Sequence, residues 1–114
     1  MEGCLFCGIV AGTIPSTEVA ASRHSYAFRD VLPVAPSHVL VVPREHIEDA
    51  AAITPADGEI ISDMLELARG VASSEGLSER GYRLVFNVGP ESGNSVPHLH
   101  LHVLGGRFMS WPPG

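Results

Sequence analysis

The sequence predicts a single α+β domain built on an antiparallel sheet of about five strands. Its 114 residues suffice for one domain, residues 1–114, and are too few for two. Apolar runs of strand length are joined mainly by short turns, which favours an antiparallel sheet over a doubly wound parallel one. Only the stretch between residues 54 and 76 has the apolar periodicity of a long helix.

The first expected elements are a short helix and two short strands. The CxxC segment at residues 4–7 opens the helix, which we expect to end near Gly12. Strands are predicted over residues 17–21 and 26–30. They are joined by a turn that contains His24, which we expect to be solvated.

A third strand is predicted at residues 39–42, where four apolar residues follow one another. A continuous apolar run is typical of a central strand buried on both faces. Pro43 should end it, because proline cannot donate to a strand ladder. His38 stands just before this strand, and residues 48–53 are expected to form a short helix or turn.

The long helix has a strong start signal at residues 54–57. Thr54 can cap it, Pro55 fits the first turn, and Asp57 opposes the positive end of the helix dipole. Gly76 is the expected stop. The predicted buried stripe consists of Ile60, Ile61, Met64, Leu65, Ala68, Val71 and Ala72.

Two strands should complete the sheet, at residues 83–88 and 98–104. Asn87 stands near the end of the first. The loop of residues 89–96 between them is rich in glycine and serine. Such a loop is often a plain turn, but its glycines also allow backbone N–H groups to converge on an anion.

The last strand carries the pattern His98-Leu99-His100-Leu101-His102. Because side chains alternate across a strand, three imidazoles share one face and apolar side chains share the other. Neighbouring histidines would be about 6.6 Å apart, and the outer two about 13 Å. Since imidazoles bound to one zinc ion lie within roughly 4 Å of each other, all three should not share one ion. The remaining interpretation is that these histidines act as a nucleophile, or as an acid–base set, on an anion.

Composition excludes several classes of protein. The formal charge is −6 and the chain has no lysine, which argues against sequence-independent nucleic-acid binding. No apolar run has the length of a membrane span and no signal peptide is evident, so we expect a cytoplasmic protein. Cys4 and Cys7 are then more consistent with thiols or metal ligands than with a disulfide. Buried thiols, a redox pair and half of a zinc site all remain open.

The triplet resembles the signature of the histidine-triad (HIT) superfamily, and the chain is most similar to its Hint branch of nucleoside phosphoramidases. The matches extend from Cys4 to the C-terminus and include Ile14-Pro15, Ala35-Pro36-Ser37-His38, Asn87, Gly93-Asn94-Ser95-Val96 and Trp111-Pro112-Pro113-Gly114. The resemblance implies the HIT fold, with two protomers in a symmetric dimer. It also implies that the C-terminal tail reaches toward the partner subunit's active site.

The resemblance implies an enzyme that hydrolyses purine nucleoside 5′-phosphoramidates (of AMP or GMP) through a nucleotidyl-histidine. His100 would attack the α-phosphate, His102 and Ser95 would hold its oxygens with N–H groups near Gly93, and His38 would assist proton transfer. The implied catalytic set is His38, Ser95, His98, His100 and His102. The implied nucleotide-binding set is Leu5, Phe6, Ile9, Phe28, Asp30, Val31, Asn87, Gly93, Ser95, His100, His102 and Trp111, with Asp30 on the ribose hydroxyls.

The resemblance also implies a structural zinc ion that the chemistry itself does not need. Its ligands would be Cys4, Cys7, His46 and His98. The carbonyl of His98 is expected to fix the tautomer of His100. Two alternatives remain: a dinucleoside polyphosphate hydrolase or nucleotidyl transferase of the same superfamily, or a zinc-stabilised nucleotide-binding or interaction module with little turnover.

Overall fold

The computed structural model describes residues 1–114 and confirms the antiparallel sheet. The strands are β1 (Glu18–Ala21), β2 (Ser25–Arg29), β3 (Ser37–Pro43), β4 (Tyr82–Val85) and β5 (Leu101–Gly105). Their order in the sheet is β1-β2-β3-β5-β4, and every neighbouring pair is antiparallel. The helices are α1 (Leu5–Ala11) and α2 (Gly58–Ser74), with short 3-10 helices at residues 50–52, 55–57 and 90–92.

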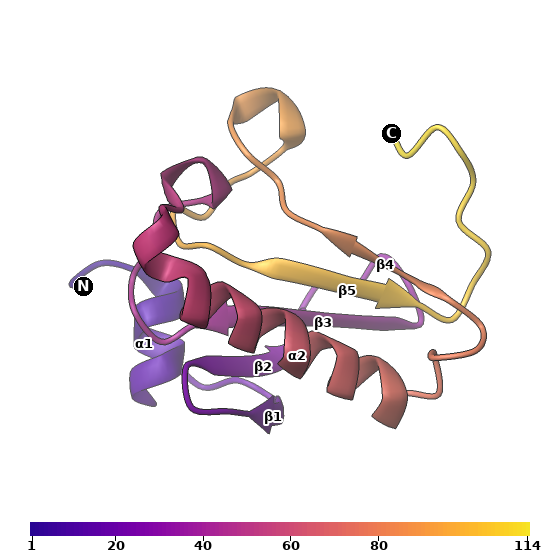
Figure 1. Ribbon diagram of the computed structural model, residues 1–114, viewed down its shortest axis with the longest axis horizontal. Helices are drawn as coiled ribbons and strands as arrows, with labels where there is room; N and C mark the ends of the chain where they lie inside the picture. The colour runs from indigo at the N-terminus through magenta and orange to yellow at the C-terminus, as the bar shows by residue number, and fades with distance from the viewer.

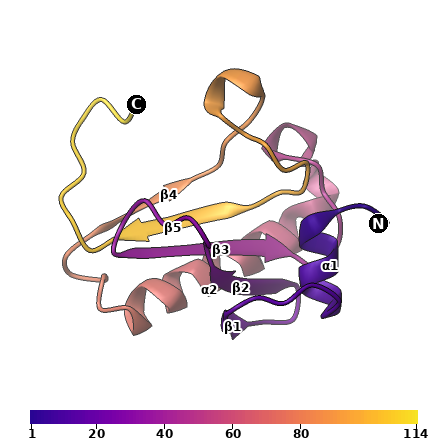
Figure 2. The same cartoon turned by 180° about the vertical axis from the view of Figure 1, so that it is seen from behind.

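The two helices lie on opposite faces of the sheet. α2 crosses the face seen in Figure 1, and α1 lies against the other face near one end, as Figure 2 shows. The larger core packs α2 on the sheet and includes Leu99, Leu101 and Val103. The smaller core packs α1 on the other face and consists of Phe6, Ile9, Phe28, Leu40 and Val42. The predicted alternation of the last strand is therefore confirmed, because its apolar side chains face α2.

β3 is the central strand, and all seven of its residues are buried. Its successive side chains face the two cores in turn, which explains the continuous apolar run. Pro43 ends it, as predicted. His38 lies within β3 rather than before it, paired with Leu104 of β5.

The start of α2 follows the predicted capping pattern. The Asp57 carboxylate accepts the Thr54 N–H at 2.9 Å, while residues 55–57 form a 3-10 turn that continues into α2. The predicted stripe is wrong at Leu65, which is 43% exposed; Leu67 packs on the core instead. Leu67 follows Met64 by three residues and precedes Val71 by four, so it shares their face of the helix.

Both predicted C-terminal strands are shorter in the structure. β4 ends at Val85, so Asn87 lies beyond the ladder. β5 begins only at Leu101, which pairs with Val41. The register would place Leu99 opposite Pro43, where β3 ends. The Leu99 N–H instead donates to the carbonyl of Ile47 at 2.6 Å. His98 to His100 therefore lie outside the sheet, with a bend at His98.

The turn between β1 and β2 is tied to α2, so the expectation of a solvated His24 is wrong. His24 is half-buried, with its Nε2 3.6 Å from Glu59. Asp63 of α2 accepts hydrogen bonds from the N–H of His24 and from the hydroxyls of Ser22 and Ser25. These bonds lower the pKa of Asp63 against the opposing effect of its burial.

A second tie holds the far end of α2. Arg29 of β2 binds Glu75 with two hydrogen bonds of 2.6 and 3.0 Å, and the Ser37 hydroxyl donates to the same carboxylate. This anchors the helix end to two strands. None of the helices combines the length and the apolar composition needed to cross a membrane.

Candidate functional site

His100 has a fixed tautomer. Its Nδ1 lies 2.7 Å from the carbonyl oxygen of His98, so Nδ1 carries the hydrogen and donates it. A neutral His100 then has a lone pair on Nε2, which makes no hydrogen bond within the chain. The ring lies between Phe6 and His102, with ring centroids 5.1 Å from each. His100 therefore presents a free imidazole nitrogen in a defined orientation.

His38 and His102 form a chain of hydrogen bonds that begins at the backbone. The N–H of Val34 donates to His38 Nδ1 at 3.1 Å, so a neutral His38 carries its hydrogen on Nε2. That atom lies 2.8 Å from His102 Nδ1 and 3.3 Å from Asp30 Oδ2. Donation to His102 places the His102 hydrogen on Nε2, which is buried and has no partner in the chain. The chain thus ends in an unused N–H donor.

Both histidines of this chain favour the neutral form. Burial lowers the pKa of His102 to about 4, and the charges of His100 and His38 act in the same direction. Burial also lowers the pKa of His38, opposed by the nearby Asp30 carboxylate. Near neutral pH, the site therefore offers donors of fixed direction without permanent positive charge.

A second cluster brings together Cys4, Cys7, His46 and His98, whose ligand atoms all lie within 4.8 Å of one another. His98 Nδ1 is 3.3 Å from Cys4 Sγ, 3.4 Å from Cys7 Sγ and 3.2 Å from His46 Nδ1. Atoms bound tetrahedrally to zinc lie about 3.3–3.8 Å apart. The spacing of the cluster is therefore close to that of a four-ligand zinc site.

The donor set of this cluster also fits a metal ion. His98 Nε2 lies 3.1 Å from the carbonyl of Pro43, so it carries the hydrogen and leaves a lone pair on Nδ1. Such a bond to the second ring nitrogen is the usual support of a metal-binding histidine. His98 is buried and the other three side chains are half-buried. Two thiolates and two imidazoles would hold zinc in a closed, structural site.

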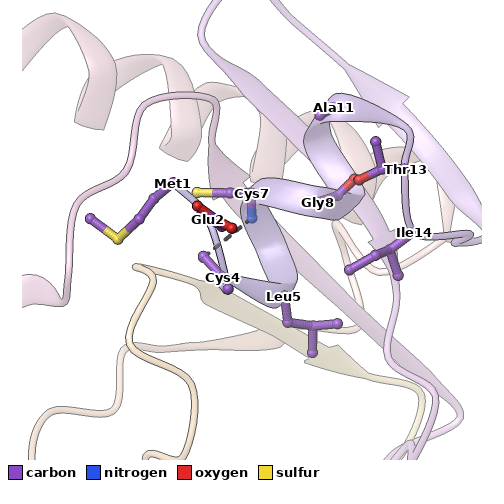
Figure 3. A pocket seen from close by; sticks show the side chains of 10 residues that line it. Met1, Glu2, Cys4, Leu5, Cys7, Gly8, Ala11, Thr13 and Ile14 are labelled. Atoms are coloured by element: carbon purple, nitrogen blue, oxygen red, sulfur yellow. Dashed lines mark hydrogen bonds between the residues drawn. The ribbon is translucent and has the colours of Figure 1, made fainter.

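The two thiols are reached from a hollow beside α1. It has a volume of about 500 Å³, and Figure 3 shows Cys4 and Cys7 among the side chains that line it. Burial and the neighbouring Cys4 raise the pKa of Cys7, so the metal-free thiol holds its proton. Because a metal binds the thiolate, binding must release that proton. This hollow serves the metal cluster rather than His100.

The residues that the family resemblance assigns to a base and sugar pocket differ in how exposed they are. Phe6, Ile9 and Phe28 are buried together in the smaller core. Leu5 is 46% exposed, and Val31 is 89% exposed on the connection that follows β2. Asp30 is half-buried, with Oδ1 accepting the N–H of Leu32.

The loop before the triplet contains Gly93 and Ser95. Gly93 has a φ of 81°, the left-handed conformation that favours glycine. Ser95 is exposed and borders a polar hollow of about 290 Å³ together with Asn94, whose buried Oδ1 has no partner. Asn87 makes no hydrogen bond within the chain through its side chain, so no contact here ties it to the histidines.

Trp111 is not buried against its own chain, and its proposed contact with a partner subunit stays a prediction. It is 81% exposed, and Figure 1 shows the C-terminal tail leaving the sheet at the end opposite α1. Arg83 of β4 holds the tail: its guanidinium donates to the carbonyl of Ser110 at 3.2 Å and lies 5.9 Å from the indole centroid.

Sequence reasoning missed the backbone groups that orient the histidines. The N–H of Val34 and the carbonyl of Pro43 set the tautomers of His38 and His98, and no side-chain pattern marks such groups. It also gave Arg29 no role, although the Arg29–Glu75 pair anchors α2.

Comparisons with known proteins agree with this geometry. A family model described as the HIT domain matches residues 11–109. A crystal structure of a HIT family hydrolase from Legionella pneumophila is 49% identical, with a TM-score of 0.96 over 98% of this chain and 100% of that one. A 14 kDa zinc-binding protein from Zea mays is 44% identical over 96% of this chain and 87% of its own. An uncharacterized HIT-like protein from Synechococcus elongatus is 42% identical over 99% and 98%.

The family match covers most of the chain, and the relatives align along nearly its whole length. The matched region includes β3 and the triplet, which together supply His38, His98, His100 and His102. On these grounds, the chain belongs to the HIT family.

Proposed function

We propose that this protein hydrolyses purine nucleoside 5′-phosphoramidates, releasing the nucleoside monophosphate and an amine. The observation that carries the proposal is the 2.7 Å bond from His100 Nδ1 to the His98 carbonyl, which leaves Nε2 unengaged. An imidazole in this form is a nucleophile at neutral pH. The Legionella relative, named as a HIT family hydrolase, supports the hydrolase class. The phosphoramidate substrate is inferred from the Hint-like segments, which include the C-terminal tail that contains Trp111.

In the first step, His100 Nε2 forms a bond to the α-phosphorus as the P–N bond of the substrate breaks. The unpaired Nε2–H of His102 is suited to bind a phosphate oxygen where negative charge develops. Ser95 and the N–H groups near Gly93 would bind the remaining oxygens, and Asp30 the ribose. The departing nitrogen needs a proton, and because both histidines are neutral, the His38–His102 pair would relay it from water rather than hold it in advance. Water then cleaves the nucleotidyl-histidine and restores neutral His100.

We also propose that zinc occupies the Cys4/Cys7/His46/His98 cluster. The spacing of the ligand atoms and the bond from His98 to Pro43 support this assignment, as does the name of the maize relative. A site closed by four protein ligands would join α1, the segment after β3 and the start of the triplet. Metal analysis of protein prepared without added zinc should find about one ion per chain, and far less than one would remove the assignment.

A symmetric dimer is the third part of the proposal. β4 is an edge strand of the sheet, and it carries the exposed Leu84. The exposed Phe108 and Trp111 of the tail are apolar surface that a second protomer could cover. Light scattering coupled to gel filtration should give twice the chain mass, and a monomer would refute this part.

The reaction is tested by AMP release from adenosine 5′-phosphoramidate, with the wild type and His100→Ala compared. We expect turnover by the wild type and its loss in the folded variant. Faster cleavage of a diadenosine polyphosphate would favour the polyphosphate branch. Nucleotide binding without turnover of either compound would favour a binding module. Full activity of His100→Ala would contradict the assigned nucleophile.

A further inference from the structure

His98 belongs to both clusters through different atoms. Its Nδ1 faces Cys4, Cys7 and His46, while its carbonyl oxygen accepts the hydrogen of His100 Nδ1. The residue that a metal would hold through its side chain therefore also carries the acceptor that fixes the tautomer of His100.

The sheet does not hold this carbonyl in place. His98 precedes β5, so no ladder bond fixes its orientation. The backbone here is held by the bonds from His98 N–H to Val96 and from Leu99 N–H to Ile47. The remaining anchors are the buried side chains of Leu99, which lies in the larger core, and of His98 itself. The orientation of the His98 side chain depends on Pro43 on one side and the metal cluster on the other.

Phe6 provides a second route between the clusters. It lies between Cys4 and Cys7 in the CxxC segment and is buried. Its ring contacts His98 and His100 edge-on, with centroid distances of 6.0 and 5.1 Å. A metal ion that fixes the two cysteines would also fix Phe6 against the ring of His100.

We propose that the Cys4/Cys7/His46/His98 cluster positions the nucleophile, so that metal binding holds His100 in the tautomer and ring orientation required for attack. This inference rests on the proposed function for the role of His100. The four ligands and Phe6 are positioning residues, because they act through the His98 carbonyl and the Phe6 ring. Groups that orient a reacting side chain contribute about 10- to 100-fold. Metal loss should therefore lower kcat by that factor and change KM little.

His46 is the best residue to test, because its polar contacts are with Cys7 and His98 only. His46→Ala removes one ligand, whereas His46→Cys retains a zinc-binding Cys₃His set. His24→Ala is the matched control, since it removes a histidine from the turn between β1 and β2. For each variant we would measure bound zinc, kcat and KM with adenosine 5′-phosphoramidate, and the NMR signal of the His100 Nδ1 proton. His100→Ala assigns that signal.

We expect His46→Ala to lose zinc, to lose the slowly exchanging Nδ1 proton signal, and to fall 10- to 100-fold in kcat. His46→Cys should recover all three, and His24→Ala should match the wild type. A folded, zinc-free His46→Ala that keeps both the signal and kcat would overturn the inference. If the wild type does not turn over the substrate, the proposed function fails, and the Nδ1 signal still decides whether the metal positions His100.

If His46→Ala does not fold, Phe6→Leu decides, because this variant keeps all four ligands. A normal zinc content with a weakened Nδ1 signal and lower kcat would support the inference. Wild-type values for the signal and kcat would overturn it.

Discussion

The two histidine clusters differ in where their free nitrogen atoms point. In the Cys4/Cys7/His46/His98 cluster, two sulfur and two nitrogen atoms converge, with the Nδ1 atoms of the two histidines 3.2 Å apart. In the His38/His102 pair, each donor meets an acceptor, and the chain ends in an unused N–H. A cation can lie between ligand atoms that converge in this way, whereas the donor–acceptor chain is formed by hydrogen bonds alone. The same residue type therefore offers candidate metal ligands in one region and a free hydrogen-bond donor in the other.

Backbone groups orient three of the histidines, namely His38, His98 and His100. The Pro43 carbonyl accepts a hydrogen bond from His98 Nε2, which leaves His98 Nδ1 free to bind a metal. The His98 carbonyl accepts from His100 Nδ1, which leaves His100 Nε2 unengaged. The Val34 N–H donates to His38 Nδ1, so the hydrogen of His38 lies on Nε2 and points toward His102. A mutation in the His38/His102 pair should therefore lower turnover and leave the zinc content unchanged.

The largest effect is expected for His102→Ala. Loss of a donor to the phosphate should lower kcat by about 10²–10³, with one zinc per chain still bound. Steady-state kinetics and metal analysis on the same preparation check this. A drop in zinc content would mean that the clusters are not separable, and an unchanged kcat would remove His102 from the site.

Cys4→Ser should destabilise the fold, in addition to the loss of kcat expected when the cluster loses its metal. Loss of a structural metal is expected to cost on the order of 3 kcal/mol, equivalent to a fall of roughly 10 °C in Tm. Thermal unfolding with and without a chelator measures the cost, and the chelator should have little effect on the variant. A wild type insensitive to the chelator would contradict the structural role.

The His38–His102 chain predicts that acid destabilises the fold. The pKa of His102 is about 4 in the folded protein against 6.5 for the free side chain, so between these values the unfolded chain binds more protons. The free energy of unfolding should therefore fall as pH drops from 6.5 toward 4. His102→Asn should make this fall shallower in urea unfolding across that range, and an identical pH dependence would refute the assignment.

Asp63→Ala is expected to have the smallest functional effect and serves as the stability control. It removes the acceptor of three hydrogen bonds that join the turn between β1 and β2 to α2, at a cost of about 1–2 kcal/mol. Zinc content and kcat should stay at wild-type values below the unfolding transition. A loss of turnover in the folded variant would indicate that the clusters respond to general destabilisation.

Much of this arrangement could be predicted from the sequence, because strand alternation is local. The pattern at residues 98–103 placed apolar side chains on one face and histidines on the other, and the structure confirms it. The distance argument against a single three-histidine metal site also agrees, since His98 and His102 belong to different clusters. The Hint-like substrate, the nucleotide pocket and the dimer stay predictions.

What the sequence could not predict depends on tertiary partners. β5 starts late because β3 ends at Pro43, which strand propensity at residues 98–100 does not show. His24 is half-buried because Glu59 and Asp63 of α2 lie beside its turn. Trp111 lies against Arg83 and is otherwise exposed on this chain, because the apolar character of a side chain does not by itself specify a contact.

Intact-protein mass spectrometry after rapid mixing with adenosine 5′-phosphoramidate tests directly whether His100 is the nucleophile. We expect a transient adenylyl adduct that maps to His100 in the wild type and in His24→Ala, and that is absent in His100→Ala. Hydrolysis with no adduct in the millisecond range, or an adduct on another residue, would contradict the assignment of His100 as the nucleophile.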